Sequence, residues 1–277
     1  MDKEQIWSLI ERALDEDVGQ GDVASMWALP SNAIARGCIV AREAGVLAGI
    51  EVAQAVFERV NALIAFSPRH VDGARISAED ELAAVVGPAT SVFAAERTAL
   101  NFVGRMSGIA TLTRRFVEAV QGTNAVILST RKTAPGLRTI DQWAVRLGGG
   151  GTHRARLDET VFIRSGHLAI AGGIAAAMER VRQRATGLQV VVEAENWAQL
   201  DEALPLEPDR IMLTGMPAQD IVDAVKWVAG RLPLEVSGPI TLDNVRAIAE
   251  TGVDYISVPA LTQCAPDLRI GLVIDAP

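Results

Sequence analysis

Hydrophobic positions near the beginning of the chain recur with the period of an α-helix. Ile6, Leu9, Ile10, Ala13 and Leu14 are spaced as i, i+3, i+4, i+7 and i+8, which places them on one face of a helix. Glycines at positions 19 and 21 then end this helix. The pattern that follows predicts two short strands within 34–50, a helix over 51–60, short strands over 61–95 interrupted at Pro68, Gly73 and Gly87, and a long helix over about 92–120.

The long predicted helix contains Gly104 and Gly108. A glycine weakens a helix by about 1 kcal/mol relative to alanine. We therefore expect either a kink or a close backbone contact near Ser107 and Gly108.

Strand-like and helical patterns alternate in the second half of the chain. Runs rich in β-branched residues occur at 125–130, 160–164, 189–194, 210–214, 234–238 and 254–259, and helical patterns separate most of them. This alternation indicates βα units and a parallel sheet. Because no GxGxxG motif follows the first strand, an incomplete α/β barrel is favoured over a doubly wound sheet. We expect an N-terminal domain over 1–110 and a barrel domain over 111–277, and leave open that the last residues return to the N-terminal domain.

Composition narrows the function classes. The net charge is −8 and the aromatic residues are six Phe, five Trp and one Tyr, which argues against nucleic-acid binding. The chain has no uncharged apolar run of membrane-spanning length. Two distant cysteines and a start without the apolar region of a signal peptide favour a cytoplasmic protein with no disulfide framework.

Cationic residues gather at the predicted strand ends, where βα barrels carry their functional groups. They are Arg131, Lys132, Arg138, His153, Arg154, Arg164 and His167. Arginine binds carboxylates and phosphates in a bidentate manner, and the backbone N–H groups of Gly148–Gly151 and Ser237–Gly238 could cradle a phosphate. The alternative is that single arginines pair with Asp141, Asp158 and Glu159. The clustering favours an anion pocket.

Two further candidates have competing interpretations. Glu193 and Glu195 could form a paired-carboxylate metal site, but residues two apart share a side only within the strand. His167 could be a catalytic acid or base, or a polar residue at a helix N-terminus.

Several motifs resemble one known family. They are Glu96-Arg97 with Leu100-Asn101, Ser107-Gly108, Thr130-Arg131-Lys132-Thr133 with Pro135-Gly136-Leu137-Arg138, Gly148-Gly149-Gly150, His153-Arg154 and Gly252-Val253-Asp254. Together they look like the quinolinate phosphoribosyltransferase family over nearly the whole chain. The resemblance implies an N-terminal α/β sandwich domain plus an incomplete (β/α) barrel, in a homodimer. It implies a pentosyltransferase that joins quinolinate to phosphoribosyl pyrophosphate with Mg²⁺, giving nicotinate mononucleotide, pyrophosphate and CO₂.

The resemblance also implies roles for individual residues. Arg97, Arg131, His153 and Arg154 would hold the dicarboxylate, with Arg97 reaching into the partner's site. Ser237 and Gly238 would bind the 5′-phosphate, and Lys132 would contact the donor or the substrate. From their place at the predicted strand ends, we also expect Thr130, Arg138 and Arg164 in the substrate site. The expected catalytic residues are Lys132, Glu193 and His167, with Glu193 also a candidate ligand of Mg²⁺.

The sequence departs from the family pattern where acids are usual, at Ser129, Ser165, Val191 and Thr214. The alternative is therefore a diverged relative that keeps the anion pocket but runs a different reaction on, or merely binds, an aromatic carboxylate or phosphorylated metabolite. If the main interpretation holds, we expect turnover of quinolinate to be weak, because acids near ribose and Mg²⁺ stabilise developing charge.

Overall fold

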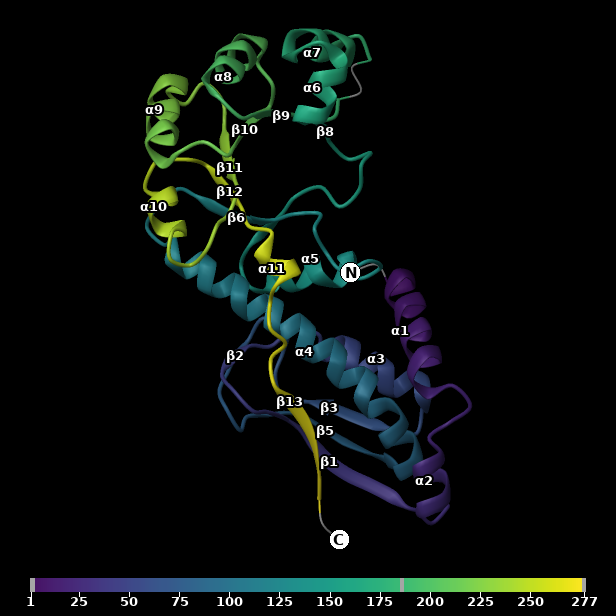
Figure 1. Ribbon diagram of the computed structural model, residues 1–277. Coiled ribbons are helices and arrows are strands. Elements are labelled where there is room, and N and C mark those ends of the chain that lie inside the picture. Colours follow the sequence, from purple (N-terminus) through teal and green to yellow (C-terminus); the bar gives the residue numbers. More distant parts are fainter. Residues whose placement is uncertain (1–2, 185–186, 276–277) are drawn as a thin grey trace. The chain divides into compact units, whose positions relative to one another are not determined.

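The computed structural model describes residues 3–184 and 187–275, and the chain forms two compact units (Figure 1). The first unit comprises Met1–Arg114, Thr133–Gly149 and Cys264–Pro277. The second comprises Arg115–Lys132 and Gly150–Gln263. A domain boundary at residue 110 stays a prediction.

The first unit contains helices on an antiparallel sheet. Its helices are α1 (Lys3–Val18), α2 (Val23–Ala28), α3 (Ile50–Val60), most of α4 (Ala89–Ala119) and α5 (Arg138–Leu147). Its strands are β1 (Ile34–Ala41), β2 (Gly45–Val46), β3 (Ala65–Pro68), β4 (Arg75–Ile76), β5 (Glu81–Pro88) and β13 (Ile270–Ile274). The predicted first helix is confirmed as α1, with Leu9, Ile10 and Leu14 buried.

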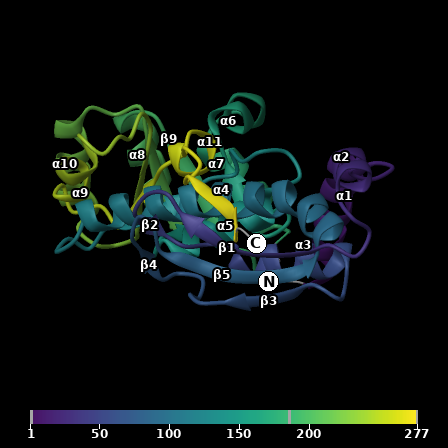
Figure 2. The same ribbon diagram turned by 90° about the horizontal axis from the view of Figure 1, so that it is seen from below.

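Four of these strands form one sheet in the order β13-β1-β5-β3. Figure 2 shows α4 running along one face of this sheet. The apolar face of α3 supplies Phe57 to the core, where it is fully buried together with Ile39 of β1 and Met106 of α4. The last strand of the chain, β13, pairs with β1 in an antiparallel register.

Glycines in this unit act by close packing. The predicted close backbone contact at Gly108 is confirmed, because a Cβ there would lie 2.0 Å from the carbonyl oxygen of Pro266. The predicted break at Gly87 is wrong: this residue lies inside β5 opposite Ala35, and its lack of a Cβ admits Ile64. Helix α4 begins at Ala89, earlier than expected.

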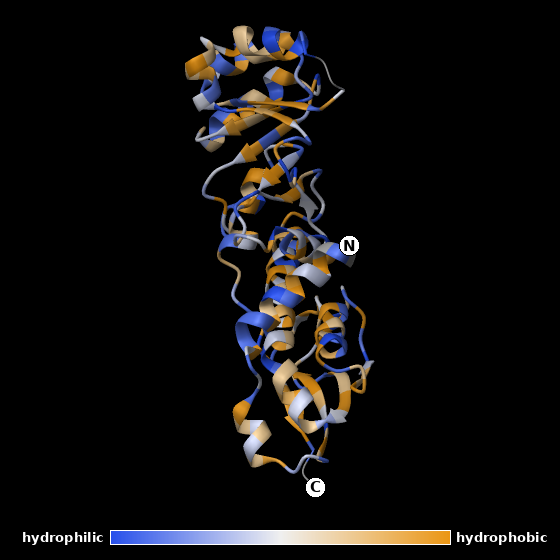
Figure 3. Cartoon of the chain, turned by 90° about the vertical axis from the view of Figure 1, so that its right-hand side faces the viewer, coloured by the Kyte–Doolittle hydropathy of each residue, from blue (hydrophilic) through white to orange (hydrophobic). Residues whose placement is uncertain are grey.

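The second unit is built of βα repeats. Its strands are β6 (Val126–Ser129), β7 (Gly151–Thr152), β8 (Val161–Ile163), β9 (Val190–Ala194), β10 (Arg210–Thr214), β11 (Leu234–Ser237) and β12 (Tyr255–Ser257). Its helices are α6 (Ser165–Ala171), α7 (Ile174–Arg182), α8 (Trp197–Ala203), α9 (Ala218–Val228), α10 (Val245–Ala249) and α11 (Ala260–Gln263), with a 3₁₀ turn at Leu204–Leu206. All six predicted strands are confirmed. In Figure 3 the strands are mainly hydrophobic, whereas the helices alternate between hydrophobic and hydrophilic residues.

These seven strands form one parallel sheet in the order β7-β6-β12-β11-β10-β9-β8. The expected incomplete barrel is confirmed. The edge strand β7 was not predicted, because two residues at the end of a glycine run carry no alternating pattern. Residues 153–160 connect the two edge strands, and Arg154 in this connection lies 5.4 Å from the ring centre of Phe162 in β8. Among the described residues, no helix is long and apolar enough to cross a membrane.

Candidate active site

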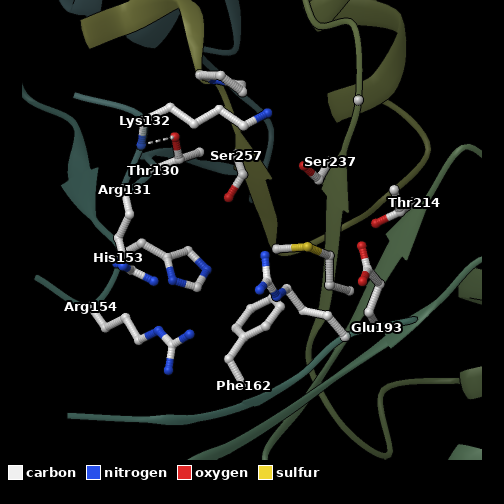
Figure 4. Close-up of a pocket in the computed structure, with 14 residues that line it drawn as sticks. Thr130, Arg131, Lys132, His153, Arg154, Phe162, Glu193, Thr214, Ser237 and Ser257 are labelled. Carbon is white, nitrogen blue, oxygen red and sulfur yellow. Dashed lines mark hydrogen bonds between the residues drawn. The ribbon is translucent and has the colours of Figure 1, made fainter. Parts of the chain in front are cut away.

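A cavity of about 370 Å³ opens at the carboxyl ends of the parallel strands (Figure 4). All of its lining residues belong to the second unit. They are Thr130, Arg131, Lys132, His153, Arg154, Phe162, Arg164, Glu193, Met212, Thr214, Ser237, Gly238, Ser257 and Pro259. This is the edge at which parallel α/β sheets bind ligands.

Cations occupy one side of this cavity. Arg131 and Lys132 follow β6, and His153 and Arg154 follow its neighbour β7, so adjacent strands bring the two pairs together (Figure 4). The turn after β6 is held by the Lys132 N–H, which donates to Thr130 Oγ1 at 3.1 Å, and by Thr262 Oγ1, which donates to the Lys132 carbonyl at 2.9 Å.

The charge of Arg154 is only partly compensated. Its guanidinium donates to the carbonyl oxygens of Leu157 and Thr160, which carry no net charge. Burial lowers the pKa of Arg154, and the positive charges of Arg131 and Arg164 lower it further, against a weaker opposing effect of Glu159. A cluster of mutually repelling cations is stabilised by a bound anion.

An aromatic ring braces two of these cations. The ring of Phe162 packs edge-to-face against His153, with centroids 5.4 Å apart, and Arg154 lies over the Phe162 ring at the same distance. Such contacts fix ring and guanidinium orientations.

The opposite side of the cavity carries one acid. Glu193 of β9 lies beside Thr214 of β10 (Figure 4), and its Oε2 accepts a hydrogen bond from the Ser165 N–H at 3.0 Å. The Thr214 hydroxyl is buried and has no hydrogen-bond partner among the described residues.

The described residues contain no group of three or more acidic, histidine or cysteine side chains that could hold a metal ion. Mg²⁺ usually keeps several waters and binds one or two carboxylates together with substrate phosphates. Glu193 fits a Mg²⁺ ion carried by a phosphorylated substrate, but the site is not a complete protein cage.

Arg97 and Arg138, two residues from the predicted set, belong to the first unit and do not line the cavity. Arg97 is exposed on α4, and Arg138 begins α5 and donates to Thr133 Oγ1 at 3.2 Å.

His167 is also absent from the lining. It lies in the first turn of α6, where its Nδ1 accepts a hydrogen bond from the Arg164 N–H at 3.0 Å. This contact is that of a polar residue at a helix N-terminus, the alternative to a catalytic acid or base.

Pairing of arginines with Asp141, Asp158 and Glu159, the alternative to an anion pocket, is observed for arginines outside the cavity lining. Arg156 pairs with Asp158 and Glu159, and Asp141 accepts a bidentate contact from Arg105. Glu195 is exposed beyond the end of β9 and does not line the cavity. The glycine run 148–151 serves packing at both ends, because a Cβ on Gly148 would meet Thr113 and one on Gly151 would meet Leu128.

Sequence reasoning missed Phe162, Met212 and Ser257 in the lining, whereas Pro259 was expected at a strand end. The alternation of strand side chains could have indicated them, because Phe162 precedes Arg164 by two positions, and Met212 precedes Thr214 likewise.

Profiles of a known family match both parts of the chain. The profile described as quinolinate phosphoribosyl transferase, N-terminal domain, matches residues 22–107, and that of the C-terminal domain matches residues 109–273. The chain belongs to the quinolinate phosphoribosyltransferase family.

Characterised and solved members of the family resemble the chain along its length. A relative named nicotinate-nucleotide pyrophosphorylase (carboxylating), from Mycobacterium leprae, is 42% identical over 269 residues, covering 95% of this chain and 95% of the relative. The structure of a nicotinate-nucleotide pyrophosphorylase from Ehrlichia chaffeensis has a TM-score of 0.94 and 37% identity, covering 97% of this chain and 98% of that one. One from Francisella tularensis has a TM-score of 0.95 and 32% identity, covering 99% and 98%.

The positions that depart from the quinolinate phosphoribosyltransferase pattern lie in or beside the cavity. Thr214 lines it, and the Ser165 N–H donates to Glu193. Val191 is buried in β9, two residues before Glu193, and Ser129 is fully buried at the end of β6. Glu193 is therefore the single carboxylate among the described lining residues.

Proposed function

We propose that this chain is a carboxylating nicotinate-nucleotide pyrophosphorylase. It would join quinolinate to phosphoribosyl pyrophosphate and release nicotinate mononucleotide, pyrophosphate and CO₂. The observation that carries the proposal is a cavity with Arg131, His153 and Arg154 on one side and Glu193 on the other, in a chain 42% identical to a relative of that name.

The two sides of the cavity suit the two parts of the reaction. Arg131, His153 and Arg154 would hold the two carboxylates of quinolinate, with Thr130 and Arg164 beside them. The carboxylate that leaves as CO₂ would be desolvated among these residues, while the ring nitrogen becomes positive on bonding to the ribose carbon.

On the other side, Glu193 would stabilise the positive charge that develops on the ribose as pyrophosphate departs. Lys132 would neutralise the leaving pyrophosphate, and Ser237 and Gly238 would bind the 5′-phosphate. Mg²⁺ would be held by Glu193 and the donor's phosphates, where it supplies positive charge to the leaving group.

Two further proposals concern the assembly of the protein and its location in the cell. A homodimer is proposed because the family resemblance implies that Arg97 reaches into the partner's site, and Arg97 does not line the cavity of the second unit. A cytoplasmic location is supported by the two cysteines, Cys38 and Cys264, which are both free thiols.

The test is a steady-state assay of quinolinate-dependent pyrophosphate release, with Mg²⁺ varied and a panel of other aromatic acids run in parallel. Glu193→Gln should lower kcat by about 10²–10³-fold, the usual worth of one charge-stabilising group. The matched control is Glu195→Gln, an exposed glutamate outside the cavity, which should keep the wild-type rate. Absence of quinolinate turnover beside turnover of another acid would refute the assignment and favour the diverged-relative alternative.

The same assay tests whether the absence of acids that are usual in the family lowers kcat. With Glu193 as the single described lining carboxylate, we expect turnover below the ordinary range of about 1–10³ s⁻¹. A kcat inside that range would show that the replacements at Thr214 and Val191 are harmless.

A further inference from the structure

A buried carboxylate lies under the cavity and is outside the set of residues assigned so far. Glu235 is on β11, two residues before the lining residue Ser237, and its side chain has no exposed surface. Alternation along the strand points both side chains to the same side. An isolated charge at such a position is expensive, so its partners define its role.

Glu235 accepts hydrogen bonds from three side chains. His153 Nε2 lies 3.1 Å from Oε1 and 3.3 Å from Oε2, Arg210 donates to Oε2 at 2.9 Å, and the Ser257 hydroxyl donates to Oε1. Of these three donors, His153 and Ser257 line the cavity. Glu235 therefore connects the two lining residues from below.

The ionisation of Glu235 determines which ring nitrogen of His153 carries the proton in their contact. Burial raises the pKa of Glu235, but the hydrogen bonds from His153, Ser257 and Arg210 outweigh it and lower the pKa overall. An ionised carboxylate can only accept hydrogen bonds. The proton in the contact between the two residues must therefore be on Nε2 of His153.

Arg210 supplies the charge balance for this carboxylate. It lies over the ring of Tyr255, 3.9 Å from the centroid, and its side chain is only 18% exposed. A buried ion pair is seldom a net source of stability, since apolar residues of similar volume often serve as well. Stability alone therefore gives little reason for a carboxylate here.

We propose that Glu235 is a positioning residue: it accepts a hydrogen bond from the Nε2–H of His153 and so leaves the Nδ1–H of the doubly protonated imidazole to donate to the substrate carboxylate. Phe162 packs against the same ring at an interplanar angle of 62°, which restricts the imidazole further. The carboxylate part of this inference rests on the proposed function; the fixed Nε2–H does not.

The first experiment needs no substrate. The chain has three histidines, so ring ¹⁵N–¹H spectra can be assigned with His70→Gln, His153→Gln and His167→Gln variants. We expect a slowly exchanging Nε2–H signal from His153, lost in a Glu235→Met/Arg210→Met variant, which removes the acceptor of that proton and avoids an unpaired Arg210. Persistence of that signal in the folded double variant, or its absence from the wild type, would overturn the proposal.

The second experiment measures quinolinate binding by calorimetry. The Glu235→Met/Arg210→Met variant should bind on the order of tenfold more weakly, the size typical of directly coupled residues, while keeping a wild-type Tm. Adding His153→Ala to it should cost much less affinity than His153→Ala costs the wild type, because Glu235 acts through His153.

The outcomes separate the two proposals. Wild-type affinity in the stable double variant, or full additivity with His153→Ala, would overturn the positioning role. A wild type that binds no quinolinate would count against the proposed function, and the ring N–H signal alone would then decide the role of Glu235.

Discussion

Arginines in this chain differ in what balances their charge. Arg156 has two carboxylate partners within its own loop, Asp158 and Glu159, and is exposed. Arg154, two residues earlier, donates to carbonyl oxygens, and its pKa is lowered by burial and further by the charges of Arg131 and Arg164. A bound carboxylate would thus stabilise the charge of Arg154 strongly and that of Arg156 only weakly.

This contrast gives a prediction for substrate affinity. Arg131→Ala and Arg154→Ala should each weaken quinolinate binding by about 2–4 kcal/mol, because each leaves a substrate carboxylate desolvated without its partner. Arg156→Ala is the matched control and should bind as the wild type does. Calorimetric titration of the three variants decides it, and unchanged affinity in Arg131→Ala would remove that residue from the site.

The positions of cavity residues were predictable where chemistry is visible in the residue type, whereas their binding roles stay predictions. Thr130, Arg131, Lys132, His153 and Arg154 were expected together and line one cavity. Phe162 and Glu235 were missed, because a phenylalanine in a strand looks like core and a glutamate before Ser237 looks exposed. Alternation along the strands places both side chains on the side of the cavity, but only the contacts of each side chain show what it does there.

Elements were predictable where the hydrophobic period is long. Helix α1 and the six strands of the second half have clear periods and were found. The two-residue strand β7 has none, and its place at the sheet edge depends on pairing with β6. Gly87 was predicted to interrupt a strand, but it lies within β5. A glycine is needed there because Ile64 occupies the space that a Cβ would take.

Close packing of α4 gives a prediction at this scale. Gly108→Ala would place a Cβ 2.0 Å from the carbonyl oxygen of Pro266, so one backbone must move, and overpacking of this kind costs about 1–3 kcal/mol. Gly166→Ala in α6 is the control, since a Cβ there meets nothing within 4 Å and alanine favours a helix. Thermal unfolding should show a lower Tm for the first variant and an equal or higher Tm for the second. Equal Tm values for Gly108→Ala and the wild type would contradict the contact.

The start of α3 depends on a carboxyl group from another segment. Asp72 Oδ1 accepts a hydrogen bond from the Ile50 N–H at 2.9 Å, while Oδ2 is buried without a partner among the described residues. Burial raises the pKa of Asp72 to about 6, and Glu51 adds to this against opposing backbone hydrogen bonds. The folded state therefore binds this proton more tightly than the unfolded state.

A pH-dependent stability follows from that difference. The contribution of Asp72 is fully present below its unfolded pKa of 3.8 and is lost as pH rises through about 6. Asp72→Asn, which imitates the protonated group, should match the wild type near pH 4 and exceed its stability by up to about 3 kcal/mol at pH 7.5. Urea unfolding across this range, with the exposed Asp15→Asn as control, checks it. An Asp72→Asn variant less stable than the wild type at pH 7.5 would show that the charge itself supports α3.

At the scale of the whole molecule, the expected substrate-binding arginines are divided between the two units. Arg131 and Arg154 line the cavity of the second unit, whereas Arg97 is exposed on α4 in the first. If the proposed homodimer is correct, Arg97 of one copy completes the cavity of the other. A two-fold axis would then create two equivalent shared sites.

Subunit mixing tests this arrangement. Arg97→Ala and Arg131→Ala should each be nearly inactive alone. In a mixed dimer, one site would combine the intact Arg131 of one copy with the intact Arg97 of the other, so activity should return to about one site per two. The control mixes Arg131→Ala with Arg154→Ala, whose lesions lie in the same unit. Each site of that mixed dimer keeps one lesion, so no activity should return. Recovery in both mixtures, or in neither despite subunit exchange seen by mass spectrometry, would show that Arg97 does not act across the dimer.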